Sequence, residues 1–456
     1  MSRIRRDYIP KQWTAKVNEK FNFKNGNLCY LSATFYYMNV LIKQAKLISP
    51  SSPFNGKIKD ILITDGIITT IGDSIKDKAE QVIEHEGLCV SIGWMDMFAD
   101  FADPGYEHRE NLQTGAKAAA AGGFTDVMLI PNSKPVVDTK SQVEYIVQKA
   151  KEVAVNIYPI GAVSKRAEGK ELAEMYDMQR SGALAFSDGI YPIQNSGLIL
   201  KALQYVKSFA GTVIQIPDDT SIGLNGLMNE GIVSTQMGLP GKPILAEELM
   251  VARDIKLARY ADSKLHFTGV SSPKSLEYIK RAKEGGIKVS CSVTPYQVYF
   301  CDEDLQGYDT NLKCNPPLRT RADMMAIRKA LLDGTIDCIA SHHLPQHSDD
   351  KVCEFEYAKH GMISLETMFS VLIDSGLSAE DFVQMQTVNV RHIFGLPVPQ
   401  IKEGEIACLT LFTTDTEFVF EETMIHSKSK NSPFTGKKFK GKVIGIINKS
   451  NIQLNN

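Results

Sequence analysis

The sequence has no run of apolar residues close to the ~20 that a membrane-spanning helix needs, so we expect no membrane segment. Its N-terminus carries Arg3, Arg5 and Arg6 without an apolar core behind them, which argues against a secretory signal. Neither charge is in excess, because 51 basic and 53 acidic residues leave a net charge of −2. Bulk charge therefore points to neither a nucleic acid nor an anionic membrane surface as partner.

Closely spaced cysteine pairs are also missing. No Cys-x-x-Cys occurs, and the eight cysteines stand far apart, at positions 29, 89, 291, 301, 314, 338, 353 and 408. Scattered thiols in a chain of 456 residues fit a reducing compartment better than a disulfide framework. We therefore expect a soluble cytoplasmic protein whose thiols fill the core.

Three regions are predicted along the chain. Residues 1–37 are polar and aromatic without periodicity and are interpreted as an extension, with Met38 as an alternative translation start. Residues 38–90 and 395–456 are rich in strands, and Ile61–Thr64 and Ile67–Ile71 flank Asp65-Gly66, a favoured hairpin turn. Both ends together predict one small composite β-sandwich domain around a different central region, residues 91–394.

The central region alternates short apolar strands with amphipathic helices, such as 141–155, 275–284 and 324–332, which is typical of parallel βα units. No GxGxxG or GxxxxGK[ST] phosphate loop is present, which disfavours an open doubly wound sheet. The predicted fold class is therefore α/β, a (β/α)₈ TIM barrel. The eight strands are expected at Val90–Met97, Thr125–Ile130, Asn156–Ile160, Ala183–Phe186, Thr212–Ile216, Lys264–Gly269, Lys288–Val293 and Asp337–Ser341.

In such a barrel the functional side chains follow the C-terminal ends of the strands. Those positions carry Phe98, Asp100, Asp188, Ile216, Pro217, Asp218, Gly269, His342 and His343. A hydrolase that activates water with a divalent cation needs three or more nitrogen or oxygen ligands. Phe98, Ile216 and Gly269 offer no such side-chain atom, so we expect no bound metal and no other cofactor.

Several segments, in matching order and spacing from Met38 to Lys449, resemble class I dihydroorotases of the amidohydrolase superfamily. They are Pro104–Glu107, Ala118–Thr125 with Pro131 and Asn132, Ala185–Asp188, Met228–Gly231, Ala252–Ile255, Asp309–Thr320, Asp333–Asp337 and Ser427–Gly436. The resemblance implies a barrel of the amidohydrolase type and a zinc enzyme that closes carbamoyl-aspartate to dihydroorotate in pyrimidine synthesis.

The functional residues that the resemblance implies do not carry over. The family's first strand ends Asp-x-His-x-His-x-Arg, and its two histidines and arginine fall on Phe98, Asp100 and Ala102. Its later zinc histidines fall on Ile216 and Gly269. Its Asp-His-Ala-Pro-His motif appears as His342-His343-Leu344-Pro345-Gln346, so His342 stands at the position of the aspartate acid/base. Of the metal-site positions only Asp188 remains.

The remaining polar residues allow two interpretations each. Asn132, Asn315 and His343 match the substrate side of the family's pocket, although both asparagines also suit turns beside proline. Asp188 is interpreted as a helix cap or as a metal ligand. His342, His343 and His347 could hydrogen-bond loop carbonyls, or with Asp100 or Asp188 form a rearranged zinc site.

The leading hypothesis is a non-catalytic dihydroorotase homologue. The resemblance implies aspartate transcarbamoylase as its structural partner, because inactive relatives of this kind accompany that enzyme. One alternative is an active cyclic amidohydrolase with a rearranged zinc site. Another is a scaffold like the dihydropyrimidinase-related cytoskeletal proteins. Homo-oligomers are expected under all three.

Overall fold

The computed structural model describes residues 39–50 and 52–455. The extension predicted for residues 1–37 and the alternative start at Met38 lie outside these ranges. Within them no helix combines the length and the hydropathy that crossing a lipid bilayer requires.

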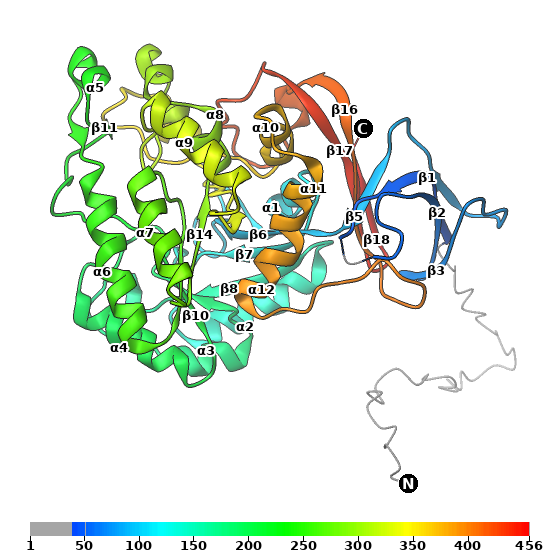
Figure 1. Ribbon diagram of the computed structural model, residues 1–456, viewed down its shortest axis with the longest axis horizontal. Helices are drawn as coiled ribbons and strands as arrows, with labels where there is room; N and C mark the ends of the chain where they lie inside the picture. The colour runs from blue at the N-terminus through cyan, green and yellow to red at the C-terminus, as the bar shows by residue number, and fades with distance from the viewer. Residues whose placement is uncertain (1–38, 51, 456) are drawn as a thin grey trace, which may run out of the picture. The chain divides into compact units, whose positions relative to one another are not determined.

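The centre of the molecule is a parallel sheet of eight strands in the order β15-β14-β13-β10-β9-β8-β7-β6, nearly closed into a barrel (Figure 1). This confirms the predicted fold class. The strands are β6 Trp94–Ala99, β7 Phe124–Leu129, β8 Asn156–Gly161, β9 Ala185–Phe186, β10 Thr212–Gln215, β13 Lys264–Phe267, β14 Val289–Val293 and β15 Cys338–Ile339.

Seven of the eight expected strands coincide with these elements to within a few residues, and the first needs a correction. The segment predicted as one strand, Val90–Met97, holds the end of β5 (Cys89–Ile92) and the start of β6. Strand β5 pairs with β1 and β16 of the terminal sheet, whereas β6 pairs with β7 of the barrel. A continuous apolar run hides this division, because both strands are fully buried.

The backbone after β6 meets the backbone after β15 where the barrel closes. Ala99, the last residue of β6, forms a parallel bridge with His343, and the Asp100 N–H donates to the His343 carbonyl at 2.9 Å. These bonds bring the segments after β6 and after β15 side by side, so that residues 98–100 and 341–343 share one rim.

Helices follow the strands and cover the barrel. In Figure 1 α4, α6 and α7 lie side by side along one flank, and they also contact one another. The barrel helices are α1 Leu112–Ala121, α2 Lys140–Lys149, α3 Met175–Ser181, α4 Ser196–Lys207, α6 Leu245–Ala261, α7 Pro273–Glu284, α9 Arg321–Leu332, α10 Met368–Asp374, α11 Ala379–Val383 and α12 Val390–Phe394. Two short strands, β11 Met228–Asn229 and β12 Gly241–Lys242, flank α5 Ile232–Met237, and α8 Pro295–Tyr299 follows β14.

Both chain ends build the second sheet, in the order β18-β17-β16-β5-β1-β2-β3, with β4 paired to β1. Its strands are β1 Asn39–Leu47, β2 Ile58–Thr64, β3 Ile67–Gly72, β4 Gln81–Ile83, β5, β16 Cys408–Val419, β17 Lys438–Asn448 and β18 Asn451–Leu454. The predicted Asp65-Gly66 hairpin turn is confirmed, with φ of 51° and 76° as its type I′ geometry requires.

This sheet is continuous and bends back on itself rather than splitting into two separate layers. The Ile68 N–H donates to the Glu405 carbonyl at 2.9 Å, which joins β3 to the segment before β16. Isoleucine, leucine and valine side chains from both chain ends fill the space inside the bend, among them Ile42, Ile63 and Leu409. The expected composite domain therefore exists as a bent sheet with a core of its own.

Residues 420–437, between β16 and β17, leave this sheet and pack against the barrel. Phe420, Ile425 and Phe434 join a buried cluster with Tyr296 and Phe300 of the segment around α8. The C-terminal part of the chain thus reaches the rim where the strands of the barrel end.

Candidate active-site position at the barrel mouth

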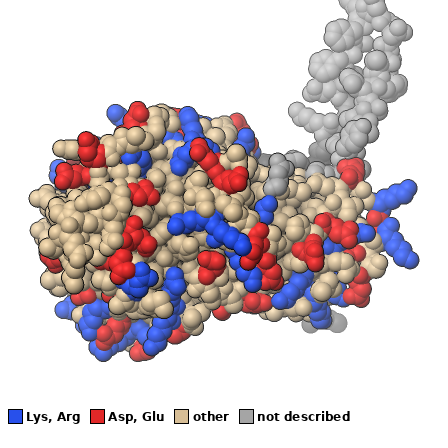
Figure 2. Space-filling model, turned by 90° about the horizontal axis from the view of Figure 1, so that it is seen from above, with Lys and Arg blue, Asp and Glu red and all other residues tan. Residues whose placement is uncertain are grey.

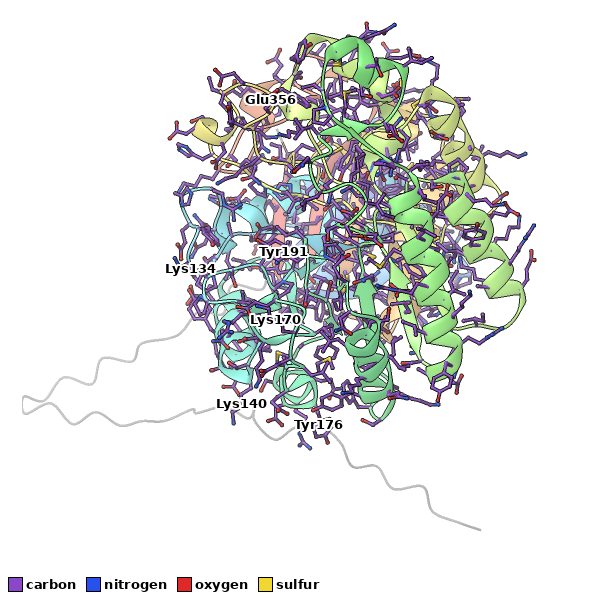
Figure 3. The ribbon with its side chains drawn as sticks, turned by 90° about the vertical axis from the view of Figure 1, so that its left-hand side faces the viewer. Lys134, Lys140, Lys170, Tyr176, Tyr191 and Glu356 are labelled. Carbon is purple, nitrogen blue, oxygen red and sulfur yellow. The ribbon has the colours of Figure 1, made fainter. Side chains whose placement is uncertain are left out.

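A cavity of about 700 Å³ opens at the C-terminal ends of the barrel strands. Tyr191 and Glu356, labelled in Figure 3, lie on the side facing the viewer and come from the segments after β9 and before α10. Asp100, Asn132, Ile216, Asn315 and His342 also line it. The structure therefore brings together most of the site positions that the sequence indicated.

Phe98 and Gly269, two further positions that the sequence indicated, pack on His342, which lines this cavity. The imidazole of His342 lies 4.5 Å from the Phe98 ring, centroid to centroid, with 30° between the ring planes. A Cβ atom on Gly269 would lie 2.9 Å from His342 Cε1. The absence of a side chain at position 269 thus makes room for His342, whose ring also packs on Phe98.

His342 also begins a chain of hydrogen bonds through the barrel interior. Its Nε2 pairs with Thr268 Oγ1 at 2.8 Å, Ser292 Oγ donates to Thr268 Oγ1 at 2.9 Å, and His266 Nε2 lies 3.0 Å from Ser292 Oγ. Burial lowers the pKa of both His342 and His266 to about 3, so both imidazoles are neutral near pH 7. His342 is a packed, neutral residue of the barrel interior rather than a carboxylate substitute.

Asp100 takes part in an ion pair at the rim. Its carboxylate accepts from the Ala102 N–H at 2.6 Å and from Arg109 Nη2 at 3.4 Å. Burial raises the pKa of the Asp100 carboxyl, although Arg109 and the Ala102 N–H act in the opposite direction. Arg109 was not predicted as a site residue, although it follows the Pro104–Glu107 segment and is one of the few cations of that loop.

Asp188 is not a helix cap, which corrects the first interpretation of this residue. It accepts from the Ser164 N–H at 2.8 Å and from Ser164 Oγ, while Asn195 caps the next helix, α4. Burial raises the pKa of Asp188 to about 6, and the bonds from Ser164 oppose this shift. The carboxylate therefore fastens the segment after β9 to the segment after β8.

The two asparagines make specific ties between segments. Asn132 donates through Nδ2 to the Asp188 carbonyl at 3.1 Å and accepts from the Ile190 N–H at 3.0 Å. Asn315 Oδ1 accepts from Lys242 Nζ at 2.8 Å, and the same ammonium lies 2.5 Å from Asp218 Oδ2. Both asparagines therefore join separate segments of the chain, in addition to any role in their own turns.

Lys242 is a second residue of the mouth that was not predicted from the sequence. It belongs to the two-residue strand β12, far along the chain from every barrel strand end, and only folding places its nearly buried ammonium beside Asp218. No local pattern marks such a residue, because its role depends on a contact between distant segments.

The histidines after β15 face different surroundings. His343 Nδ1 accepts from the Ser364 N–H at 3.2 Å, and its Nε2 lies 3.9 Å from Glu110 Oε2. His347 is half exposed and accepts from the Asp349 N–H at 3.3 Å. His342 therefore pairs with a hydroxyl, and His343 and His347 pair with backbone N–H groups. The expectation that these histidines bond to loop carbonyls was wrong.

A divalent metal does not fit this set of side chains. Phe98, Ile216 and Gly269 supply no donor atom, and Asp188 and His343 are already bound to Ser164 and Ser364. In residues 39–50 and 52–455 no group of three or more histidine, cysteine, aspartate or glutamate side chains is arranged to hold a metal ion. The zinc that the resemblance implies has no ligand set at this mouth.

The family model and the two curated proteins described next are named for dihydroorotase. The sequence model of a family described as "Dihydro-orotase-like" matches residues 88–275. A dihydroorotase from Geobacter sp. (strain M21) is 39% identical over 421 residues, which cover 91% of this chain and 99% of that protein. A dihydroorotase from Acetivibrio thermocellus is 41% identical over 419 residues, with 91% and 98% covered.

Among solved structures, the L-hydantoinase from Arthrobacter aurescens matches with a TM-score of 0.79 and 20% identity, covering 92% of this chain and 96% of that one. The dihydropyrimidinase from Brevibacillus agri NCHU1002 matches with a TM-score of 0.76 and 20% identity, covering 92% and 95%. At this identity the likeness shows the fold alone, and it confirms the expected barrel of the amidohydrolase type.

Proposed function

Since the chain belongs to the dihydroorotase-like family of pyrimidine biosynthesis, we propose that it is a non-catalytic member that acts through protein contacts, with aspartate transcarbamoylase as its partner. The observation that carries the first half of this proposal is the packing of Phe98, His342 and Gly269 on one another. At three positions where the resemblance implies functional groups, the chain carries a phenyl ring, an imidazole packed on that ring, and a glycine without a side chain.

Retention of the whole frame supports a role for the rest of the molecule. Identity of about 40% extends over 91% of the chain. Phe98, Ile216 and Gly269 nevertheless stand where the resemblance implies metal-binding histidines. Residues that surround metal ligands serve to orient them, and this function is lost when the ligands are replaced. A frame kept at full length is expected where its surface still serves a contact.

The segment 220–241, which holds β11 and α5, has the character of a contact surface. Glu230 is its one charged residue, and Leu224 and Ile232 are 79% and 77% exposed. Figure 2 shows a broad uncharged area at its left-hand end, on the side where α5 and β11 lie in Figure 1. An uncharged surface area with exposed apolar side chains is typical of protein-contact surfaces.

Two measurements test the proposal. Purified chain with added zinc should show no turnover of dihydroorotate or carbamoyl-aspartate, under conditions where the Acetivibrio thermocellus relative is active. Mixed with aspartate transcarbamoylase of the same organism, it should sediment as a complex. The variant Leu224→Asp/Ile232→Asp should lose the complex, whereas Leu332→Asp on α9, 66% exposed in the native chain, should keep it. Measurable turnover, or no complex with the native chain, would contradict the proposal.

A second candidate is an active cyclic amidohydrolase with a rearranged zinc site. It is favoured by relatives named dihydroorotase at about 40% identity and by the cavity that remains at the mouth. It predicts about one equivalent of zinc after purification and turnover that is lost in His342→Ala or Asp100→Ala. Metal analysis and the turnover assay above separate the two candidates.

A further inference from the structure

A second cavity lies apart from the barrel mouth, between the bent sheet and the barrel. Its volume is about 320 Å³, at the lower end of the usual range of small-molecule sites. Residues of α1, α10, β16, β17, β18 and the segment 420–437 line it, and Figure 1 shows α10 beside β17. Among the described residues, none lines both this cavity and the one at the mouth. It is therefore a separate candidate binding site.

The wall of this second cavity contains a carboxylate that is only half used. Glu366 directly precedes the first turn of α10, and its Oε1 accepts the His426 N–H. Its Oε2 is buried and has no hydrogen-bond partner among the described residues. Each carboxylate oxygen can accept about two hydrogen bonds, and an ionised oxygen held away from water without a donor is unfavourable. The Oε2 atom therefore favours a ligand that brings a donor.

The positive charges nearby do not satisfy this oxygen. Burial raises the pKa of the Glu366 carboxyl to about 7, against the opposing effect of the His426 N–H. The ionised form is therefore less stable here than in water, and a cation at Oε2 would stabilise it. Lys442 also lines the cavity. The charged side chains that act most on this carboxyl are nevertheless those of His343, Glu110 and Lys430.

The rest of the wall suits the apolar body of a small molecule. Half of the lining residues are apolar, among them Phe418, Met424 and Leu454. Two of the polar ones are already engaged, because Ser370 Oγ and Asn455 Nδ2 donate to backbone carbonyls at 2.6 and 2.8 Å. An apolar wall with one unsatisfied acceptor both accommodates and orients an amphiphilic ligand.

We propose that this cavity binds a small organic ammonium ion with an apolar body, whose N–H group donates to Glu366 Oε2. A charged donor is preferred because hydrogen bonds with ionised partners are roughly twice as strong as neutral ones. Since Oε1 of the same carboxylate holds the His426 N–H, the ligand shares this side chain with the segment 420–437. The inference goes beyond the proposed function and does not depend on turnover at the mouth.

The test is titration calorimetry of the full-length chain with benzylamine. At about pH 8 both the ammonium and the Glu366 carboxylate are mostly ionised. Benzyl alcohol, which has the same ring and a neutral hydroxyl group, is titrated in parallel. We expect saturable binding of benzylamine with a dissociation constant of about 1 mM or below, and binding of benzyl alcohol that is weaker by about tenfold.

Glu366→Gln removes the charge but keeps an acceptor for the His426 N–H, and it should weaken benzylamine binding by about tenfold or more. Glu403→Gln is the matched control, because Glu403 also accepts a backbone N–H, from Ile71 at 2.8 Å, but is exposed and lines neither cavity. It should bind benzylamine as the native chain does.

A second variant keeps the test open if Glu366→Gln folds poorly. Leu454 lines the cavity and is 37% exposed, so Leu454→Trp can narrow the cavity without overpacking the core. It leaves the carboxylate in place and should also weaken benzylamine binding by about tenfold.

Absence of saturable heat with benzylamine, equal affinity for benzyl alcohol, or native affinity in Glu366→Gln overturns the proposal. If Glu366→Gln does not fold, native affinity in Leu454→Trp overturns it, because benzylamine then binds elsewhere on the chain. Neither compound is a cyclic amide, so none of these results bears on the dihydroorotase assay. Turnover in that assay would in turn leave the binding of an ammonium ion by Glu366 untouched.

Discussion

Asp96 in β6 accepts both the backbone N–H and the Oγ–H of Ser341, each at 2.7 Å, across the junction where the barrel closes. Both residues are completely buried, and Asp96 also accepts from the Phe98 N–H at 3.3 Å. Burial raises the pKa of the Asp96 carboxyl, while the bonds from Ser341 oppose the shift. The first and last strands are therefore joined by a buried polar network directly beneath Phe98 and His342.

Asp96→Ala should lower the free energy of unfolding by about 3 kcal/mol, because it leaves the buried N–H groups of Ser341 and Phe98 without an acceptor. Urea denaturation measures this loss. Asp73→Ala provides the control, since that side chain is 86% exposed and pairs only with Lys59, and it should change stability by less than about 1 kcal/mol. Equal losses in the two variants would show that the junction network contributes nothing special.

Gly269→Ala should be more destabilising than Gly334→Ala. Both glycines have positive φ, 72° and 76°, so both variants carry a similar backbone strain. Only Gly269 places the new Cβ against His342, at 2.9 Å, whereas nothing lies within 4 Å of a Cβ at Gly334. The steric contact should add about 1–3 kcal/mol in thermal or urea unfolding.

The same comparison in a His342→Ala background isolates the contact. There the difference between the two glycine substitutions should shrink, because the imidazole is gone and only Pro316 Cδ, 3.3 Å from the new Cβ, still lies close to position 269. An undiminished difference would mean that His342 is not what excludes a side chain from position 269.

Stability should depend on pH through Glu366. Burial raises the pKa of this carboxyl from 4.5 to about 7, and its Oε1 accepts the His426 N–H, which ties the 420–437 segment to the barrel. The folded chain therefore holds a proton that the unfolded chain has released between these pH values. Its stabilising effect is complete below about pH 4.5 and is lost as the pH rises through about 7.

Glu366→Gln removes this titration. Between pH 5 and 7 the native chain should lose on the order of 2 kcal/mol more unfolding free energy than the variant, measured in urea at each pH. Asp188, whose pKa burial raises to about 6, contributes its own decline equally to both proteins. Parallel pH profiles for the two would contradict the assignment to Glu366.

Lys242→Met should destabilise the mouth by about 3–5 kcal/mol, because Asp218 would remain buried without its cation. The double variant Lys242→Met/Asp218→Asn should recover at least about 1 kcal/mol of that loss in urea denaturation. Lys438→Met, which breaks the exposed pair with Glu417, is the matched control and should cost less than about 1 kcal/mol. A double variant no more stable than Lys242→Met would argue against a coupled pair.

Residue patterns were enough to predict the barrel, the sequence of its strands along the chain and a small β domain built from both chain ends, because hydrophobic periodicity and turn residues are local properties. The sequence also determined that Phe98, Ile216 and Gly269 cannot bind a metal, since that follows from side-chain chemistry alone.

What those positions do instead became visible only in the folded chain. Four contacts join segments that are remote in sequence. They are the packing of His342 on Phe98, the fit of His342 against Gly269, the bond of Asp188 to Ser164 and the pairing of Lys242 with Asp218. The division of the run 90–97 between two sheets was decided in the same way. Such contacts depend on where folding brings distant segments together, and no local pattern of residues encodes that distance.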